Sequence, residues 1–109
     1  MRILGIDPGT GTTGYGVIDV EGNRLRHVDN GIIKTRSSEA LPIRLKTIYD
    51  GLSKLLLEFE PQEVAVEQVF VAKNPRSALT LGHSRGAAIL AAVNLDIIVL
   101  EYSALQVKS

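Results

Sequence analysis

The residues with the clearest chemical potential lie in a glycine-rich segment near the start of the chain. A carboxylate, Asp7, follows the apolar run at 3–6 and precedes three glycines, Gly9, Gly11 and Gly14. Glycine permits positive φ angles and close approach of the backbone to a ligand, and a carboxylate beside exposed amides suits a metal ion and a phosphate group. Asp, Pro and Gly are also common turn formers. Taken alone, the segment leaves both a simple turn and a metal or phosphate site open.

A second carboxylate, Glu67, stands inside an apolar segment. Residues 63–70 read Glu-Val-Ala-Val-Glu-Gln-Val-Phe, and so many β-branched residues favour a buried strand. An unpaired charge in such a strand is costly, so a metal ion, a basic partner or an exposed strand end must offset it. An ion pair with a nearby lysine or arginine is the alternative to a metal ligand at this position.

Seven elements are expected to position these acids. Short apolar runs bounded by turn residues predict strands, and apolar residues at three- and four-residue steps predict amphipathic helices that begin at a proline. Asn74 is suited to cap the second helix. The predicted limits are strands at 3–6, 15–18 and 25–34, a helix from 42 to just before Pro61, a strand at 63–70, a helix from 75 to about 94 and a strand at 96–101.

This order of elements is that of the ribonuclease H-like α/β fold. Its mixed five-stranded sheet has the first three strands antiparallel and the fourth and fifth parallel to the first, with helices packed on it. The fourth strand lies beside the first, so Asp7 and Glu67 should emerge at the same end of neighbouring strands, where ligands of such sheets bind. At a strand spacing of about 4.8 Å they could share a divalent cation.

Composition places the chain among ordinary globular proteins. Its 109 residues, 45% hydrophobic and 22% charged, favour one domain over residues 1–109. The absence of cysteine excludes disulfides and thiolate metal sites. Since no apolar run is long enough to span a bilayer, a cytoplasmic protein is expected.

Charge is balanced overall but not locally. Twelve basic and twelve acidic side chains cancel, yet no acid occurs at 68–95, and residues 22–38 hold one acid, Asp29, against four bases. A basic patch of this kind suits phosphate contacts, and a mixed solvated surface is the alternative. The four bases at 22–38 are Arg24, Arg26, Lys34 and Arg36.

The second predicted helix carries small residues four apart, Ala78, Gly82 and Gly86. Each glycine inside a helix costs about 1 kcal/mol relative to alanine, so a compensating gain is expected. Close approach of another backbone would supply it, either from the protein's own sheet or from a helix of a second subunit.

Several segments together resemble the RuvC-type Holliday junction resolvases. The glycine-rich opening resembles the first motif of that family, and the segment around Glu67, which reads Glu-Gln-Val-Phe, is far more specific. The likeness runs through the whole chain in order, at 6–18, 66–74, 77–82, 85–86 and 101–108. It implies a DNA endonuclease that resolves four-way junctions in recombination and repair by symmetric paired nicking.

The resemblance also implies roles for single residues. Asp7 and Glu67 would be catalytic and would bind Mg²⁺, two ions per active site in the complete protein, with Mn²⁺ as a substitute, for a two-metal in-line displacement. Phe70 matches a ring that stacks at the junction branch point, and an ordinary core phenylalanine is the alternative. Phosphate contacts are implied at three basic positions, each of which could also be plain surface: Lys73, Arg76 and Lys108.

The partners that the resemblance implies are four-way junction DNA, a second copy of the chain and a bacterial branch-migration motor complex. A two-fold dimer matches a junction with two strands to cut. The face formed by Ala78, Gly82 and Gly86 is the candidate dimer contact, with packing on the protein's own sheet as the alternative.

The sequence departs from the family pattern at its end. The family's site holds two further aspartates on a helix well beyond the fifth strand, and these 109 residues end before it. We therefore expect a C-terminally truncated domain that lacks its C-terminal helices and is inactive or severely impaired by itself. Competing functions are an actin-like ATPase or sugar kinase fragment, a ribonuclease H-like nuclease that processes ribosomal RNA, and a non-catalytic junction-binding or dimerisation module.

Overall fold

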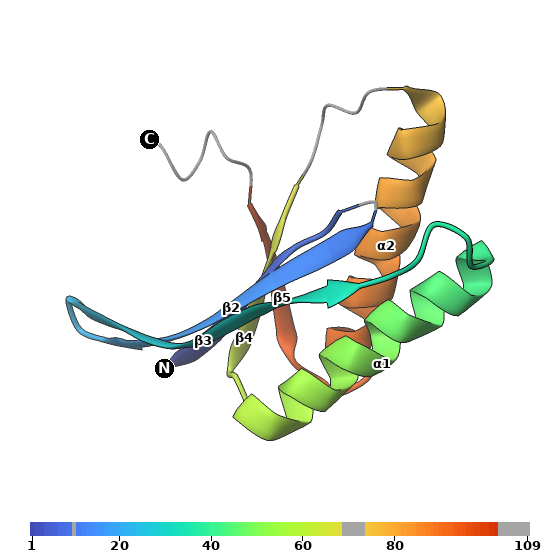
Figure 1. The fold of residues 1–109 in the computed structure, drawn as a ribbon. Coiled ribbons are helices and arrows are strands. Elements are labelled where there is room, and N and C mark those ends of the chain that lie inside the picture. The colour runs from blue at the N-terminus through green and yellow to red at the C-terminus, as the bar shows by residue number, and fades with distance from the viewer. Residues whose placement is uncertain (10, 69–73, 103–109) are drawn as a thin grey trace.

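A computed structural model describes residues 1–9, 11–68 and 74–102. Within them, five strands form a single sheet in the order β3-β2-β1-β4-β5, and both helices lie on the same side of it (Figure 1). In chain order the elements are β1 (Arg2–Asp7), β2 (Thr12–Glu21), β3 (Arg24–Lys34), α1 (Leu41–Phe59), β4 (Glu63–Glu67), α2 (Pro75–Val93) and β5 (Ile98–Tyr102).

The sheet has the predicted ribonuclease H-like topology. β1 pairs antiparallel with β2, and β2 antiparallel with β3. β4 pairs parallel with β1 on its other side, and β5 parallel with β4. Because α1 connects β3 at one edge to β4 beyond β1, the crossover makes the first and fourth strands neighbours, as predicted.

Local sequence signals set the limits of both helices. Proline occupies the first turn of each, where its missing N–H is not needed. The Asn74 side chain caps α2 by accepting a hydrogen bond from the backbone N–H of Ser77 at 2.9 Å. Glu60 ends α1 in the left-handed conformation, with φ of 49°.

The limits of the last two strands differ from the predicted ones. β5 begins at Ile98 rather than at residue 96, because Asp96 takes a left-handed conformation with φ of 57°. In this turn the backbone N–H of Ile97 bonds to the carbonyl of Ala92 at 3.1 Å. The turn therefore takes up the first two residues of the predicted strand. β4 ends at Glu67, so Gln68, which the prediction included, lies outside the strand, and the predicted positions 69 and 70 lie outside the described residues.

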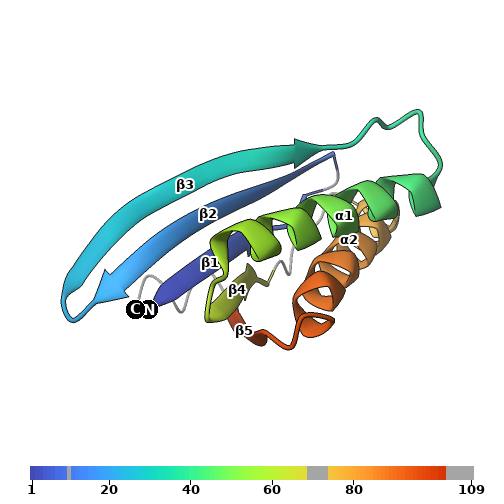
Figure 2. The same ribbon diagram turned by 90° about the horizontal axis from the view of Figure 1, so that it is seen from below.

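The core lies between the sheet and the two helices (Figure 2). Alternate residues of the central strands are fully buried there, among them Leu4, Ile6 and Val66, and Leu52 of α1 is 0% exposed. Burying one such side chain contributes about 1.5–3 kcal/mol. α2 contributes alanines to this core, and small side chains permit it to pack closely. Neither helix of the described residues is long and apolar enough to cross a membrane.

The residues between the buried ones point to the opposite side of the sheet, which no helix covers within the described part of the chain (Figure 2). We call this side the open face. The strand registers place on it Gly5, Asp7, Gly14, Gly16, Ile32, Lys34, Glu67, Leu100 and Tyr102.

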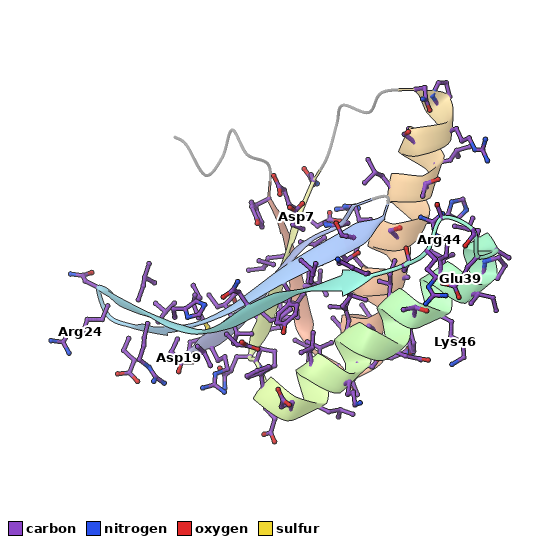
Figure 3. The ribbon with its side chains drawn as sticks, viewed as in Figure 1. Asp7, Asp19, Arg24, Glu39, Arg44 and Lys46 are labelled. Atoms are coloured by element: carbon purple, nitrogen blue, oxygen red, sulfur yellow. The ribbon has the colours of Figure 1, made fainter. Side chains whose placement is uncertain are left out.

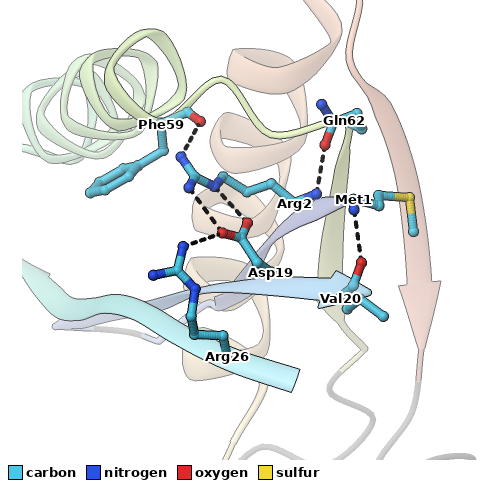
Figure 4. A network of polar contacts seen from close by, with 7 residues as sticks. All are labelled: Met1, Arg2, Asp19, Val20, Arg26, Phe59 and Gln62. Carbon is cyan, nitrogen blue, oxygen red and sulfur yellow. Dashed lines mark hydrogen bonds and ion pairs between the residues drawn. The ribbon is translucent and has the colours of Figure 1, made fainter. Parts of the chain in front are cut away.

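A polar network fixes β1 at its amino end (Figure 4). The Arg2 guanidinium donates to both carboxylate oxygens of Asp19, at 2.8 and 3.1 Å, and to the carbonyl of Phe59 at 3.0 Å. Arg26 binds the same carboxylate at 2.8 Å. These hydrogen bonds hold the pKa of Asp19 well below its usual range. The network ties the amino end of β1 to β2, β3 and the end of α1.

Candidate active site

Asp7 and Glu67 lie side by side at one end of the sheet. The parallel register pairs Ile6 of β1 with Val66 of β4, so each acid occupies the next position on its own strand. Neighbouring strands lie about 4.8 Å apart, and both side chains point to the open face. Figure 3 shows Asp7 at this end of the strands. The structure therefore brings together the two acids that the sequence predicted to meet.

The electrostatics of this pair favour a bound cation. Burial raises the pKa of the Glu67 carboxyl, and the charge of Asp7 and a hydrogen bond with it raise that pKa further. Asp7 itself is exposed. Two adjacent carboxylates fit Mg²⁺, which commonly uses one or two carboxylates together with water and substrate phosphate. Within the described residues, no group of three or more His, Cys, Asp or Glu side chains could hold a metal ion.

The loop after Asp7 is held by contacts with distant elements. The carbonyl of Gly11 accepts hydrogen bonds from the backbone N–H of Thr35 at 3.0 Å and from its hydroxyl at 3.3 Å. Arg44 of α1 donates in turn to that hydroxyl at 3.3 Å. The end of β3 and the start of α1 thus brace the loop beside the acidic pair.

Gly9 in this loop has a steric role. Among the glycines that the structure describes, a positive φ occurs at Gly22, in the turn between β2 and β3, and not in the loop. Gly9 is instead required by a close contact within the loop, because a Cβ atom there would lie 2.2 Å from the carbonyl oxygen of Thr12. The constraint at Gly9 is therefore steric and comes from the backbone of Thr12.

Tyr102 is a site residue to which the sequence analysis assigned no role. It pairs with Glu67 across β4 and β5 and lines, together with Asp7 and Gly14, a hollow on the open face. Burial raises the pKa of its phenol, and the charges of Glu67 and Asp7 raise it further. A neutral hydroxyl beside the acids is a hydrogen-bond donor for phosphate or water. The signal in the sequence for Tyr102 was its position at the end of the fifth strand, which lies beside the end of the fourth strand.

Two further basic residues lie on α2. Arg76 is exposed in the first turn of α2. Arg85 forms an ion pair with Glu101 of β5, which joins α2 to the sheet. Phe70, Lys73 and Lys108 lie outside the described residues.

The small residues of α2 do not pack on the sheet. Ala78, Gly82 and Gly86 are all exposed, and a Cβ atom added at either glycine would meet nothing within 4 Å. The alternative in which they approach the protein's own sheet is therefore wrong. Three large apolar side chains on the same helix are also exposed: Leu79 at 65%, Leu90 at 51% and Val93 at 51%.

Known proteins of one kind match the chain over nearly its whole length. The family model for crossover junction endodeoxyribonuclease RuvC matches residues 3–109. Enzymes of that name from Syntrophotalea carbinolica and Pelobacter propionicus are 62% and 58% identical over 108 residues, which is 99% of this chain. The chain spans 67% and 61% of the length of these two relatives.

Solved structures agree with this match. RuvC of Thermus thermophilus in complex with a Holliday junction substrate superimposes with a TM-score of 0.91 at 31% identity, covering 99% of this chain and 68% of that one. A yeast mitochondrial Holliday junction resolvase, at 17% identity and a TM-score of 0.70, shares the fold. So does a Ppx/GppA enzyme of Aquifex aeolicus, at 10% identity and a TM-score of 0.55. The family match over residues 3–109 and the high identity to its members show that the chain belongs to the RuvC family of crossover junction endodeoxyribonucleases.

Proposed function

We propose that the protein to which these residues belong cleaves four-way DNA junctions in recombination and repair, with Asp7 and Glu67 as catalytic metal ligands. The observation that carries the proposal is the meeting of these two acids at the ends of neighbouring parallel strands, in a chain of the RuvC family. Membership of the family makes a DNA phosphodiester the substrate, and a cytoplasmic location accords with that role.

The metal we propose is Mg²⁺, with Mn²⁺ as a substitute. Nucleases of this family depend on metal ions. A divalent cation at such a site lowers the pKa of water and neutralises charge on a phosphate. Asp7 and Glu67 would hold one cation together with water and phosphate oxygens. A second ion, as in the two-ion site we expect of the complete protein, would need further ligands besides this pair.

The residues around the proposed cation would have different roles. Asp7, being exposed, can be reached by a phosphate that approaches the open face. Glu67 is more buried, and its neighbour Tyr102 can donate its phenolic hydrogen toward the bound phosphate. Gly14 pairs with Asp7 and leaves space beside it. We propose further DNA contacts at Arg76 in α2 and, from the resemblance, at Phe70, Lys73 and Lys108.

A cleavage assay on a synthetic four-way junction tests the proposal. In the complete protein with Mg²⁺, wild type should make paired nicks, whereas Glu67→Gln and Asp7→Asn should bind the junction without cutting it. Normal cutting by either variant would remove that residue from the site. The same assay on the 109-residue chain tests the expectation that it is inactive or severely impaired by itself, which robust paired nicking would contradict.

We also propose a homodimer that uses the exposed face of α2. The exposed residues Leu79, Leu90 and Val93 share this helix with two glycines that would let a partner helix approach closely. Leu90→Glu should shift the protein from dimer to monomer in light scattering. Leu57→Glu is a matched control, because Leu57 is 64% exposed on α1 and should leave the dimer intact. A branch-migration motor complex is the further partner that we propose, and co-purification with the dimeric protein would test it.

A further inference from the structure

The basic residues of β3 and the segment after it fall into two groups at opposite ends of the molecule. Arg24 lies at the tip of the long hairpin formed by β2 and β3, far from Asp7 (Figure 3). Arg26 lies near it, and its charge is matched by Asp19. Lys34 and Arg36 lie at the other end of β3, the end that also carries the acidic pair. A sequence with no net charge thus places two exposed basic residues at the same end of the sheet as its candidate site.

Lys34 shares the open face with Asp7. Its neighbour Ile33 points to the helices, where it packs against Gly51 of α1, so Lys34 points the other way. Lys34 pairs with Thr12, two strands away from Asp7 and one pair of residues further along. With strands about 4.8 Å apart and about 3.4 Å per residue, the Cα atoms of Asp7 and Lys34 are roughly 12 Å apart.

The backbone between Lys34 and Arg36 is anchored, and neither side chain is paired with an acid within the described part of the chain. The residue between them, Thr35, is the one that binds the Asp7 loop through Gly11. Lys34 and Arg36 are exposed, and neither side chain forms an ion pair with any acid of the described residues. The acids nearest in sequence form other hydrogen bonds. Asp29 accepts one from the hydroxyl of Tyr15 at 3.2 Å, and Glu39 accepts one from the backbone N–H of Arg36.

We propose that Lys34 and Arg36 bind backbone phosphates of the DNA arm that extends from the acidic pair past the end of β3. This inference rests on the proposed function, because the acidic pair is taken as the place of the scissile phosphate. A separation of roughly 12 Å places the contact within a few phosphates of the cut. The flexible stem of lysine suits such a contact, and the arginine fork can grip a phosphate with two hydrogen bonds.

A salt titration of junction binding tests the inference. The measurement uses the complete protein with Asp7→Asn in EDTA, so that the junction is bound but not cut. In that background, Lys34→Ala and Arg36→Ala should each reduce the slope of log affinity against log salt by about 0.9, and the pair by about 1.8. Between 50 and 200 mM salt, wild-type affinity should therefore fall about tenfold more than that of the double variant. Arg24→Ala, a charge removed at the far end of the same strand, should leave the slope unchanged, and Lys34→Arg with Arg36→Lys should preserve it.

Each contrary outcome has a distinct meaning. A double variant that binds with the wild-type slope overturns the phosphate contact and leaves the proposed function in place. An equal loss with Arg24→Ala overturns it too, since the effect would then follow total charge. If the charges serve only to protect the edge strand β3 from pairing with other chains, the double variant would aggregate at an unchanged slope. A wild-type protein that binds no junction overturns both proposals.

Discussion

Replacing Glu67 by glutamine should stabilise the protein in the absence of metal and remove its stabilisation by Mg²⁺. Two charges on adjacent strands, about 4.8 Å apart, repel by about 1 kcal/mol in bulk water and about 3.5 kcal/mol at an effective dielectric constant of about 20. Because Asp7 is exposed and Glu67 half-buried, we expect about 1–2 kcal/mol. For a chain of this size that corresponds to a rise in Tm of about 4–8 °C.

Thermal unfolding followed by circular dichroism is the assay. In EDTA at pH 7, Glu67→Gln should unfold at a higher temperature than wild type. With Mg²⁺ at about 100 times its Kd, wild type should gain about 2.7 kcal/mol, and Glu67→Gln should gain much less. Glu63→Gln is the matched control, because it lies on the same face at the other end of β4 and should show neither effect.

The pH dependence of stability tests independently whether the Glu67 carboxylate destabilises the fold. The pKa of Glu67 is raised in the folded protein, so its carboxylate destabilises the fold at neutral pH. That penalty should disappear as the pH falls through the folded pKa, and the advantage of Glu67→Gln in EDTA should vanish near pH 4, below the unfolded value of about 4.3. A variant that is less stable than wild type in EDTA, or that gains as much from Mg²⁺, would refute the reasoning.

Three further predictions concern the scaffold. Leu52→Ala should lower the free energy of unfolding by about 2–5 kcal/mol, measured by urea denaturation, because this fully buried side chain leaves a cavity. Gly9→Ala should reduce the Mg²⁺-dependent rise in Tm, because its Cβ atom would clash with the carbonyl oxygen of Thr12, whereas Gly11→Ala, with nothing within 4 Å, should keep that rise. Asp19→Asn should lower Tm at pH 6. Since the folded pKa of Asp19 is depressed, this difference in Tm should shrink as the pH falls from about 3.9 toward the folded value, and a constant difference would contradict the role of its ion pairs.

The sequence was sufficient for the sheet order and for the acidic pair. The helix starts were predicted correctly from the prolines and from the Asn74 cap, because each of these signals depends on only a few neighbouring residues. The crossover through α1 then leaves one simple way to place β4 beside β1, which brings Asp7 and Glu67 together.

Features that depend on contacts between distant residues were missed. The late start of β5 follows from a left-handed turn at Asp96, which no pattern in the sequence marks. The reason for Gly9 appears only when the carbonyl of Thr12 is in place. Likewise, the four basic residues at 22–38 look like one patch in the sequence. The length of the β2–β3 hairpin separates Arg24 from Lys34, and that length was underestimated, because β2 runs over Thr12–Glu21.

The parallel pairing of β1 with β4 also determines when the acidic pair can form. Its two acids are neighbours in space, yet the register joins residues 60 positions apart in the chain. During synthesis at about 5–20 residues per second, Asp7 is made roughly 3–12 s before Glu67. Closing a loop of that length carries an entropic cost of roughly 3–4 kcal/mol before any constant term, which the packed sheet must recover. A nascent chain therefore has no acidic pair until the crossover has closed, and any later opening that releases β4 separates the two acids.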